Sequence, residues 1–353
     1  MTSKRNSNFE LLRIICIVGI VIMHSYGSVF FEAKGINLVW GVFINSIFNA
    51  CVSCFILLSG YFGISFDLRK LSTLHLKVLF FSILSVLLLL LFGESVSIIK
   101  VIKAFFPVIS RTYWFISCYF VLYVFSGYIN KIPEMLSKKL FEKLIVLMVI
   151  VFSIIPSIFQ YEFMRDGGKG LINMILMYLI GAYLRKYNFN DFRKIKLLLF
   201  ICVLIIINFG INYLITYLKG GVGVNAPFAR DNSITIILLS VLIFMYFKEI
   251  KIQSKSINYI AKSVLSIYII EGAIRIILSK YFNISNFISN WYFIFILLIF
   301  SAATIIISFI LSTLYESIFN KPAQRIAMIQ IKLIEKLYSL LINFSQKAIS
   351  NLK

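Results

Sequence analysis

The chain has 353 residues, of which 60% are hydrophobic and 14% are charged, and its mean hydropathy is +0.94. These values exclude an ordinary soluble domain, in which about 25% of the residues are charged. The net charge of +21 is compatible with nucleic-acid binding or with basic loops that face anionic lipid. Because the cations lie between long apolar runs, we expect a lipid bilayer, and no nucleic acid, as the partner.

Ten apolar segments follow one another along the chain, separated by charge clusters and turn residues. Most are close to the roughly 20 residues that a helix needs to cross a bilayer, and none shows the period-two alternation of a barrel strand. We therefore predict an all-α, polytopic membrane helical bundle of about ten transmembrane helices. The predicted spans are about 9–31, 37–63, 71–93, 112–130, 141–160, 170–187, 195–218, 232–248, 259–280 and 291–317.

The distribution of Lys and Arg indicates the orientation of the bundle. An even number of spans places both termini on one side, and with ten spans that side carries 24 of the 35 Lys and Arg residues while the other side carries nine. Cytoplasmic loops of membrane proteins carry the excess of positive charge, so both termini are predicted to be cytoplasmic.

Residues 1–317 form the predicted transmembrane domain, and residues 318–353 form a predicted cytoplasmic amphipathic tail. Apolar residues such as Ile326, Ile329 and Leu333 recur in the tail at helical spacing with lysines between them, which predicts a helix on the inner membrane surface. The sequence shows neither an internal repeat nor paired broken helices, which disfavours a secondary transporter. The five cysteines form no ligand pattern, and no metal is expected.

The first predicted helix contains ELLRIICIVGIVIMH over residues 10–24, with three ionisable residues in an apolar run. Arg13 and His24 are eleven positions apart, which at about 100° per residue is within about 20° of three full turns. Both side chains therefore share one helix face, about 16 Å apart along the axis. Arg13 lies near the predicted cytoplasmic end, His24 lies past the midplane, and Glu10 can pair with Arg13.

His24 has two interpretations, either a polar residue packed against a neighbouring helix or a functional group. Ionisable groups are costly within a membrane and usually line a cavity or pathway, which favours the functional interpretation. A neutral imidazole can act as a general base near neutral pH and take a proton from an attacking hydroxyl.

Several segments together resemble the acyltransferase 3 family of integral membrane acyltransferases, most closely its capsule and wall polysaccharide O-acetyltransferase branch. The first helix matches the family's signature of Arg, ten residues and His, and the resemblance covers nearly the whole chain in order. The other matching segments are CFILLSGYFGISFDLRKL (54–71), YWFISCYFVLYVFSGYINKI (113–132), LIGAYLRKY (179–187), VNAPFA (224–229) and INYIAKSVLSIYIIEGAIRI (257–276).

The resemblance implies an O-acetyltransferase that takes an acyl group, usually acetyl, from cytoplasmic acetyl-CoA or another acyl-CoA and delivers it to a polysaccharide or lipid-linked sugar outside. It implies that Arg13 contacts the phosphates or the carbonyl region of CoA, that His24 is the catalytic residue, and that Glu10 positions Arg13. His24 can deprotonate the acceptor hydroxyl directly or carry the acyl group covalently, and both mechanisms stay open.

A basic stretch follows the second predicted span on the predicted cytoplasmic side. Arg69, Lys70 and Lys77 are either positive-inside charge or a cradle for the phosphates of CoA, where the family often has arginines. His75, the only other histidine, has a predicted cytoplasmic placement that argues against acceptor-side chemistry.

Two predicted outer regions contain candidate acceptor-binding residues. Arg111, Tyr113 and Trp114 lie at the start of the fourth predicted span, where aromatic residues form either an interfacial belt or a platform for a sugar ring. Asn225, Arg230 and Asp231 precede the eighth predicted span and offer hydrogen bonds to a glycan.

Glu271 and Arg275 are four residues apart in the ninth predicted span, so they form either an intrahelical ion pair or a contact to substrate. The related sequences often have His where this chain has Glu271. A carboxylate can accept a hydrogen bond or act as a base there, but it does not reproduce an imidazole at neutral pH unless burial raises its pKa.

We therefore predict a multi-pass O-acetyltransferase of the bacterial cytoplasmic membrane that modifies a cell-envelope polysaccharide. Two other classes remain open. One is a transporter or flippase of lipid-linked sugars, in which the polar face of the first helix lines a substrate path, and the other is a membrane scaffold without chemistry. Acetylation that depends on His24 excludes both of them.

Overall fold

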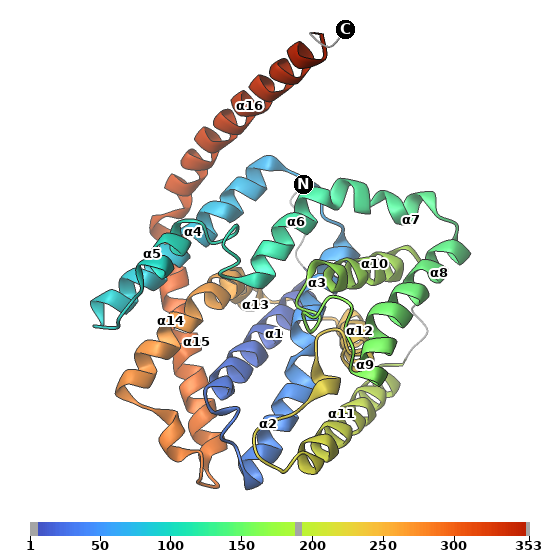
Figure 1. Ribbon diagram of the computed structural model, residues 1–353, viewed down its shortest axis with the longest axis vertical. Coiled ribbons are helices and arrows are strands. Elements are labelled where there is room, and N and C mark those ends of the chain that lie inside the picture. The colour runs from blue at the N-terminus through green and yellow to red at the C-terminus, as the bar shows by residue number, and fades with distance from the viewer. Residues whose placement is uncertain (1–5, 188–192, 351–353) are drawn as a thin grey trace.

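The computed structural model describes residues 6–187 and 193–350, and within these ranges every regular element is helical (Figure 1). The α-helices are α1 (Ser7–Tyr26), α2 (Gly35–Phe48), α3 (Ala50–Phe62), α4 (Leu68–Leu91), α5 (Ile98–Phe105), α6 (Trp114–Ile129), α7 (Lys131–Met135), α8 (Lys138–Val149), α9 (Ile155–Phe159), α10 (Leu171–Tyr187), α11 (Lys194–Leu218), α12 (Ile234–Lys248), α13 (Lys255–Ile260), α14 (Val264–Tyr281), α15 (Phe293–Ile318) and α16 (Asn320–Ser350). Short helical turns cover Gly27–Val29, Ile150–Ile154, Pro227–Ala229, Ala261–Ser263 and Ile284–Phe287.

The all-α membrane bundle predicted from the sequence is confirmed. Within the described ranges, eight helical stretches are long and apolar enough to cross a membrane. The other two predicted spans coincide with α10, which has 17 residues, and with α14, which carries Glu271, Arg275 and Lys280. Because α10 is short and α14 is charged, the count of ten spans and the cytoplasmic termini stay predictions.

The predicted spans at 37–63 and 141–160 each consist of more than one helix. The span predicted at 37–63 contains α2 and α3, which meet at Asn49. The span predicted at 141–160 contains α8, a π-helical turn at Ile150–Ile154 and α9, and Pro156 is the second residue of α9. Proline cannot donate a backbone hydrogen bond and crowds the preceding turn, which accounts for the altered helical pitch at this point.

Helix α1 lies at the centre of the bundle and contacts α2, α3, α12, α14 and α15. Leu12 and Val21 are completely buried, and Ile17 and Ile20 are almost completely buried. A helix that is apolar on most of its faces is stable in such an interior position. The helix that carries Arg13 and His24 is therefore held in place from several sides.

Helices α3 and α10 approach each other so closely that only glycine fits at the crossing. A Cβ atom on Gly60 would lie 2.0 Å from the carbonyl oxygen of Tyr178, and one on Gly181 would lie 2.3 Å from that of Leu57. Small residues let the backbones of membrane helices come together in this way. Both glycines belong to segments that resemble the acyltransferase 3 family.

Buried polar side chains connect other helices of the bundle. Asn208 of α11 donates to the carbonyl oxygen of Ser46 in α2 at 2.8 Å, and Asn8 of α1 donates to that of Phe247 in α12 at 2.9 Å. Such hydrogen bonds fix the position of one helix against another where apolar packing alone is unspecific.

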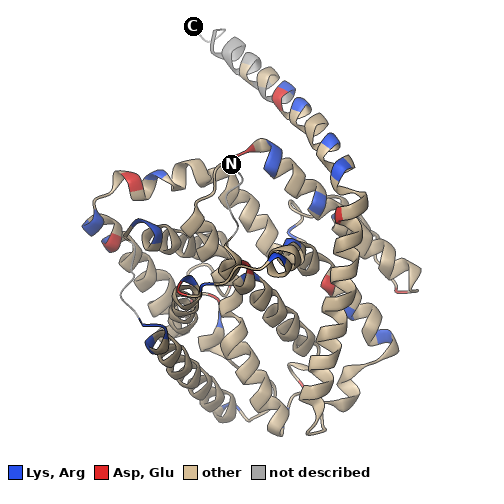
Figure 2. Ribbon diagram, turned by 180° about the vertical axis from the view of Figure 1, so that it is seen from behind, with Lys and Arg blue, Asp and Glu red and all other residues tan. Residues whose placement is uncertain are grey.

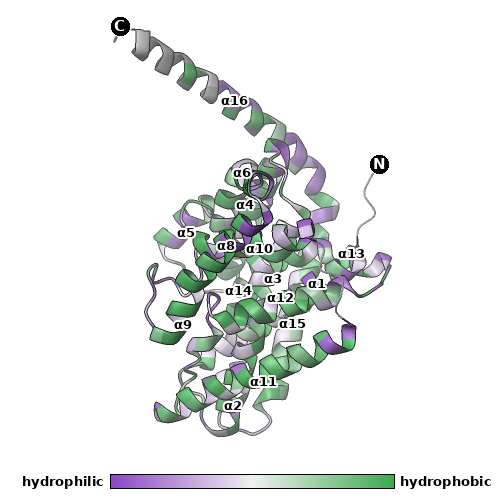
Figure 3. Cartoon of the chain, turned by 90° about the vertical axis from the view of Figure 1, so that its right-hand side faces the viewer, coloured by the Kyte–Doolittle hydropathy of each residue, from purple (hydrophilic) through white to green (hydrophobic). Residues whose placement is uncertain are grey.

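Charge and hydropathy are arranged as expected for a protein in a bilayer. Figure 2 shows Lys and Arg mostly at helix ends, in connecting segments and along α16. Figure 3 shows hydrophobic residues along the helices of the bundle, with the hydrophilic ones concentrated at the connections and at the start of α16. This pattern places the helix middles in contact with lipid or with each other.

The predicted tail forms α16, one continuous helix that extends away from the bundle at the end where the chain begins (Figure 1). It contacts α4 and α15. Ile326, Ile329 and Leu333 are exposed on it, which provides an apolar face for a membrane surface. Its position on the inner membrane surface and the division at residue 317 stay predictions.

Helix α5 is an element that the sequence analysis did not predict. It packs against α4, and the Ser97 hydroxyl caps its first turn by accepting from the Lys100 amide. Ile98 and Ile102 are exposed. Lys100 and Lys103, one turn apart, line a cavity beside α4. The helix therefore has an apolar face at the edge of the bundle and two cations on the cavity.

Candidate active site

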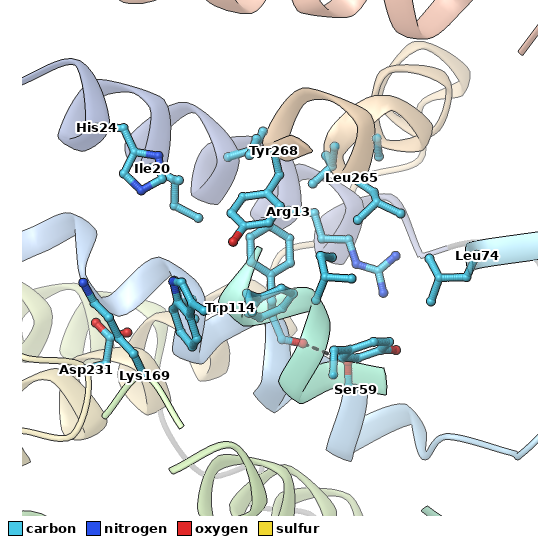
Figure 4. Close-up of a pocket in the computed structure, with 18 of the residues that line it drawn as sticks. Arg13, Ile20, His24, Ser59, Leu74, Trp114, Lys169, Asp231, Leu265 and Tyr268 are labelled. Atoms are coloured by element: carbon cyan, nitrogen blue, oxygen red, sulfur yellow. Dashed lines mark hydrogen bonds between the residues drawn. The ribbon is translucent and has the colours of Figure 1, made fainter. Parts of the chain in front are cut away.

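Arg13 and His24 line the same cavity, which has a volume of about 370 Å3 and lies between α1, α3, α6 and α14 (Figure 4). We call it the central cavity. The shared face follows from the eleven-residue spacing, because α1 continues without a break from one residue to the other. Further wall residues include Val52, Phe55 and Ser59 of α3, Phe115 and Tyr119 of α6, and Leu265 and Tyr268 of α14.

One end of the central cavity carries three cationic residues. Figure 4 shows Arg13 at this end together with Leu74 and Leu265. Lys70, one turn before Leu74 in α4, and Lys262, shortly before Leu265, also line the cavity. Lysine and arginine side chains bind phosphate groups through charge-assisted hydrogen bonds. This end therefore suits the anionic part of a ligand.

The other end of the central cavity contains His24, Trp114, Lys169 and Asp231 (Figure 4). Asp231 is only 2% exposed, and its Oδ2 atom has no hydrogen-bond partner within the part of the chain that the structure describes. A buried carboxylate oxygen without a partner is costly. Asp231 therefore places a buried acidic group beside this end of the cavity.

Lys169 is a cavity residue that the sequence analysis did not single out. The loop that carries it packs against the loop of Asp231, and the Asp231 amide donates to the Gly167 carbonyl oxygen at 3.1 Å. Gly168 has a φ of +80°, and a Cβ atom there would lie 2.3 Å from the Asn232 nitrogen. The glycine pattern GGKG at 167–170 indicates such a close approach, but it does not identify the partner loop.

His24, Glu271 and Arg275 form a chain of hydrogen bonds between α1 and α14. The Nδ1 atom of His24 lies 2.9 Å from Oε1 of Glu271. Arg275 donates from Nε to Oε2 of Glu271 at 2.5 Å and from Nη1 to the His24 carbonyl oxygen at 3.0 Å. The side chain of Glu271 is 5% exposed. The contacts of His24 and Arg275 with its two oxygens therefore hold the Glu271 carboxylate next to the imidazole ring.

This arrangement determines which ring nitrogen of His24 is available for chemistry. We assign the proton to Nδ1 because Glu271 accepts a hydrogen bond there. The Nε2 atom then carries the lone pair, and it has no hydrogen-bond partner among residues 6–187 and 193–350. A carboxylate in this position also stabilises an imidazolium once Nε2 takes up a proton. The geometry is that of a general base with its orienting group.

Glu10 lies behind Arg13, as the spacing on α1 predicts. Nη1 of Arg13 donates to Oε1 of Glu10 at 3.3 Å, and Glu10 is only 8% exposed. The side chain of Arg13 is 37% exposed, so a large part of the guanidinium remains accessible. The pair can hold the guanidinium in place while it binds an anion.

Of the other residues predicted to bind the donor, only Lys70 lines the central cavity. Arg69 is exposed and lies outside its lining. Lys77 forms an ion pair with Glu316 of α15 at 2.7 Å and also lies outside. This ion pair joins α4 to α15, so the structure gives Lys77 a structural contact in place of an accessible ammonium group. Contacts of Arg69 and Lys77 with the donor stay predictions.

The residues predicted to bind the acceptor do not all line one cavity. Trp114 lines the central cavity, while Arg111, Tyr113 and Arg275 line a second cavity of about 570 Å3 between α4, α5 and α14. Asn225 lines neither of them, and its main chain is hydrogen-bonded to the Thr216 hydroxyl. Glu271 lines neither cavity as well, because it is buried between His24 and Arg275.

Comparison with known proteins agrees with this geometry. A family model described as "Acyltransferase domain" matches residues 6–313, which include both ends of the central cavity. No curated protein matches the chain, and no solved structure matches it. Because the match extends over most of the sequence, the chain belongs to the acyltransferase 3 family, and we conclude that it is a membrane acyltransferase.

Proposed function

We propose that this acyltransferase moves an acetyl group from cytoplasmic acetyl-CoA to a hydroxyl of an extracellular or lipid-linked polysaccharide, in the cytoplasmic membrane of a bacterium. The observation that carries the proposal is the central cavity, which has Arg13 at one end and His24, with Glu271 at Nδ1, at the other. A cationic donor site and an oriented general base are the two elements that acyl transfer from CoA to an alcohol requires.

The donor would enter at the cationic end of the central cavity. Arg13, Lys70 and Lys262 offer guanidinium and ammonium groups to the phosphates of CoA. His24 lies about 16 Å further along α1, a distance that the extended pantetheine arm can bridge. Ile17 and Ile20 line the cavity between them and provide an apolar path for this arm.

In the proposed reaction, Nε2 of His24 accepts the proton of the acceptor hydroxyl while the hydroxyl oxygen attacks the thioester carbonyl carbon. The new C–O bond forms, the C–S bond breaks, and the proton passes from Nε2 to the leaving CoA thiolate. Glu271 stabilises the imidazolium that exists between the two proton transfers. Transfer through an acyl group on Nε2 is the other mechanism that the same atoms allow.

The acceptor would bind at the end of the cavity that holds Trp114, Lys169 and Asp231. An indole ring provides a flat surface for the apolar face of a sugar. Asp231 and Lys169, which line this end, offer a hydrogen-bond acceptor and a donor to a sugar hydroxyl. These groups would hold one hydroxyl of the sugar beside His24.

A deletion strain tests the proposed function. The O-acetyl signals in the NMR spectrum of its envelope glycan should disappear and should return on complementation with the wild-type gene, while the amount of glycan stays the same. A flippase would instead change the amount of glycan at the cell surface. Unchanged O-acetyl signals in the deletion strain would contradict the proposal.

Replacing Arg13 by glutamine should raise the KM for acetyl-CoA by about tenfold and change kcat much less, because the guanidinium binds the donor and takes no part in the proton transfer. Acetyl transfer measured in inverted membrane vesicles, whose cytoplasmic face is accessible to the donor, checks this. Arg193→Gln is the matched control, since Arg193 is exposed and lies outside the cavity. A fall in kcat at unchanged KM would mean that Arg13 acts on the chemical step.

A further inference from the structure

The second cavity, beside α4, α5 and α14, carries a concentration of positive charge. Lys100, Lys103, Arg111 and Arg275 line it, and no Asp or Glu does. Only Arg275 has a carboxylate partner in the described part of the chain, because Arg111 reaches the carbonyl oxygen of Lys169 at 2.9 Å and neither lysine forms an ion pair. Several cations without counter-charges in one cavity attract an anion, and phosphate is an anion that both Arg and Lys bind through charge-assisted hydrogen bonds.

The surroundings of this cavity are apolar, which indicates that the anion belongs to a membrane lipid. On α5, Ile98 and Ile102 are exposed, and after the helix Phe106 and Ile109 are exposed as well. An amphipathic helix with cations on one face and large apolar residues on the other is typical of the membrane interface. A phosphate held by α5 would therefore have its hydrocarbon part in the adjacent bilayer.

The second cavity adjoins the His24 end of the central cavity through three direct contacts. Arg275 lines the second cavity and bonds both Glu271 and the His24 carbonyl oxygen. The Arg111 guanidinium bonds Lys169, a residue of the central cavity. The Tyr113 ring lies 6.3 Å from that of Tyr268, which lines the central cavity. A sugar attached to a phosphate in the second cavity would thus lie close to His24.

We propose that the second cavity binds the phosphate or diphosphate of a membrane lipid that carries the sugar acceptor. This inference rests on the proposed function for the identity of the acceptor. Lys100, Lys103 and Arg111 bind the phosphate oxygens, and the lipid chain leaves the protein past the apolar face of α5. The acceptor would then enter from the side, out of the bilayer, while the donor enters along the bundle.

The test measures binding of radiolabelled farnesyl diphosphate, a short lipid diphosphate, to the purified full-length protein in phosphatidylcholine nanodiscs. The double variant Lys100→Gln/Lys103→Gln should bind it about tenfold more weakly, since two charge-assisted hydrogen bonds are lost. Lys34→Gln/Lys219→Gln is the matched control, because it removes the same charge from exposed lysines outside the cavity and should bind normally. Arg111→Gln, expected to bind about tenfold more weakly, is the second variant if the first one fails to fold.

Competition identifies the source of the phosphate. Inorganic diphosphate should displace the probe only in large excess, and nanodiscs that contain phosphatidylglycerol should still bind it. Displacement by inorganic diphosphate at the same concentration, or loss of binding in phosphatidylglycerol, would overturn the assignment to a lipid-borne acceptor. If Lys100→Gln/Lys103→Gln binds farnesyl diphosphate with the same affinity as the wild type and the control variant, the site itself is overturned.

The same assay separates this inference from the proposed function. His24→Ala should bind farnesyl diphosphate like the wild type, because His24 takes part in the transfer and does not line the second cavity. One outcome would overturn this inference alone. If His24→Ala loses acetyl transfer while neither the wild type nor any variant binds farnesyl diphosphate, the acyltransferase proposal stays intact.

Discussion

His24→Ala should lower kcat for acetyl transfer by about 10²- to 10⁴-fold, the range that general-base catalysis contributes in enzymes. Without Nε2, the cavity loses the base that Glu271 orients toward the attacking hydroxyl. The fold should persist, because Glu271 keeps its ion pair with Arg275 at 2.5 Å. Transfer of radiolabelled acetyl from acetyl-CoA to glycan in inverted membrane vesicles, normalised to the amount of protein, measures the effect.

The matched control is His75→Ala, which removes the only other histidine. His75 lies on α4 outside the central cavity, so its removal should leave the rate near that of the wild type. Activity of His24→Ala within threefold of the wild type would remove this imidazole from the mechanism. A loss of protein in the membrane would instead mean that His24 serves packing, the alternative that the sequence left open.

Glu271→Gln should lower kcat by about 10²- to 10⁴-fold while the KM for acetyl-CoA stays close to the wild-type value. A glutamine has one amide oxygen, whereas the structure aims two donors, His24 Nδ1 and Arg275 Nε, at the two oxygens of the carboxylate. The imidazole loses its orientation and the negative charge that stabilises its protonated form. Donor binding is unaffected because Arg13 is at the other end of the cavity.

A second variant separates this loss from misfolding. Glu271→Gln leaves the Arg275 charge without its partner, which should reduce the free energy of unfolding by about 1–3 kcal/mol. The double variant Glu271→Gln/Arg275→Gln removes the unpaired charge and should recover part of the thermal stability, yet it should not recover kcat. Recovery of both together would show that Glu271 acts only through the stability of α14.

The sequence predicted the helical bundle and the common helix face of Arg13 and His24. Both depend on local properties, namely the length of apolar runs and the angular spacing of residues along one helix. Arg13 and His24 are on the same helix, so their common face follows from their numbers alone. Glu10 belongs to the same helix and was predicted to pair with Arg13 for the same reason.

The remaining parts of the site depend on contacts between distant segments. His24 and Glu271 are separated by 247 residues, and nothing in the spacing of α14 indicates which helix its carboxylate faces. The sequence offered either an intrahelical pair with Arg275 or a contact to substrate, and the intrahelical pair is half of the observed arrangement. Lys169 was missed because a loop lysine beside glycines has no periodicity, and its place depends on how two loops pack.

Helix α5 was missed for a different reason. Its eight residues are too few for a span, and its lysines made the segment look like an ordinary connection. Only packing against α4 brings Lys100 and Lys103 together with Arg111 and Arg275 around one cavity. The second cavity could therefore not be inferred from local patterns.

The placement of Arg13 and His24 on one unbroken helix has a consequence for the size of the donor. The separation between the cation and the base is set by the rise of α1 and does not change with loop motions. If the donor is an acyl-CoA, as proposed, the intact molecule would reach both positions at once, whereas a truncated thioester without the nucleotide portion would reach only one of them. Under the proposed function, the fixed length of α1 would therefore select donors by the distance between their anionic group and their reactive carbonyl carbon.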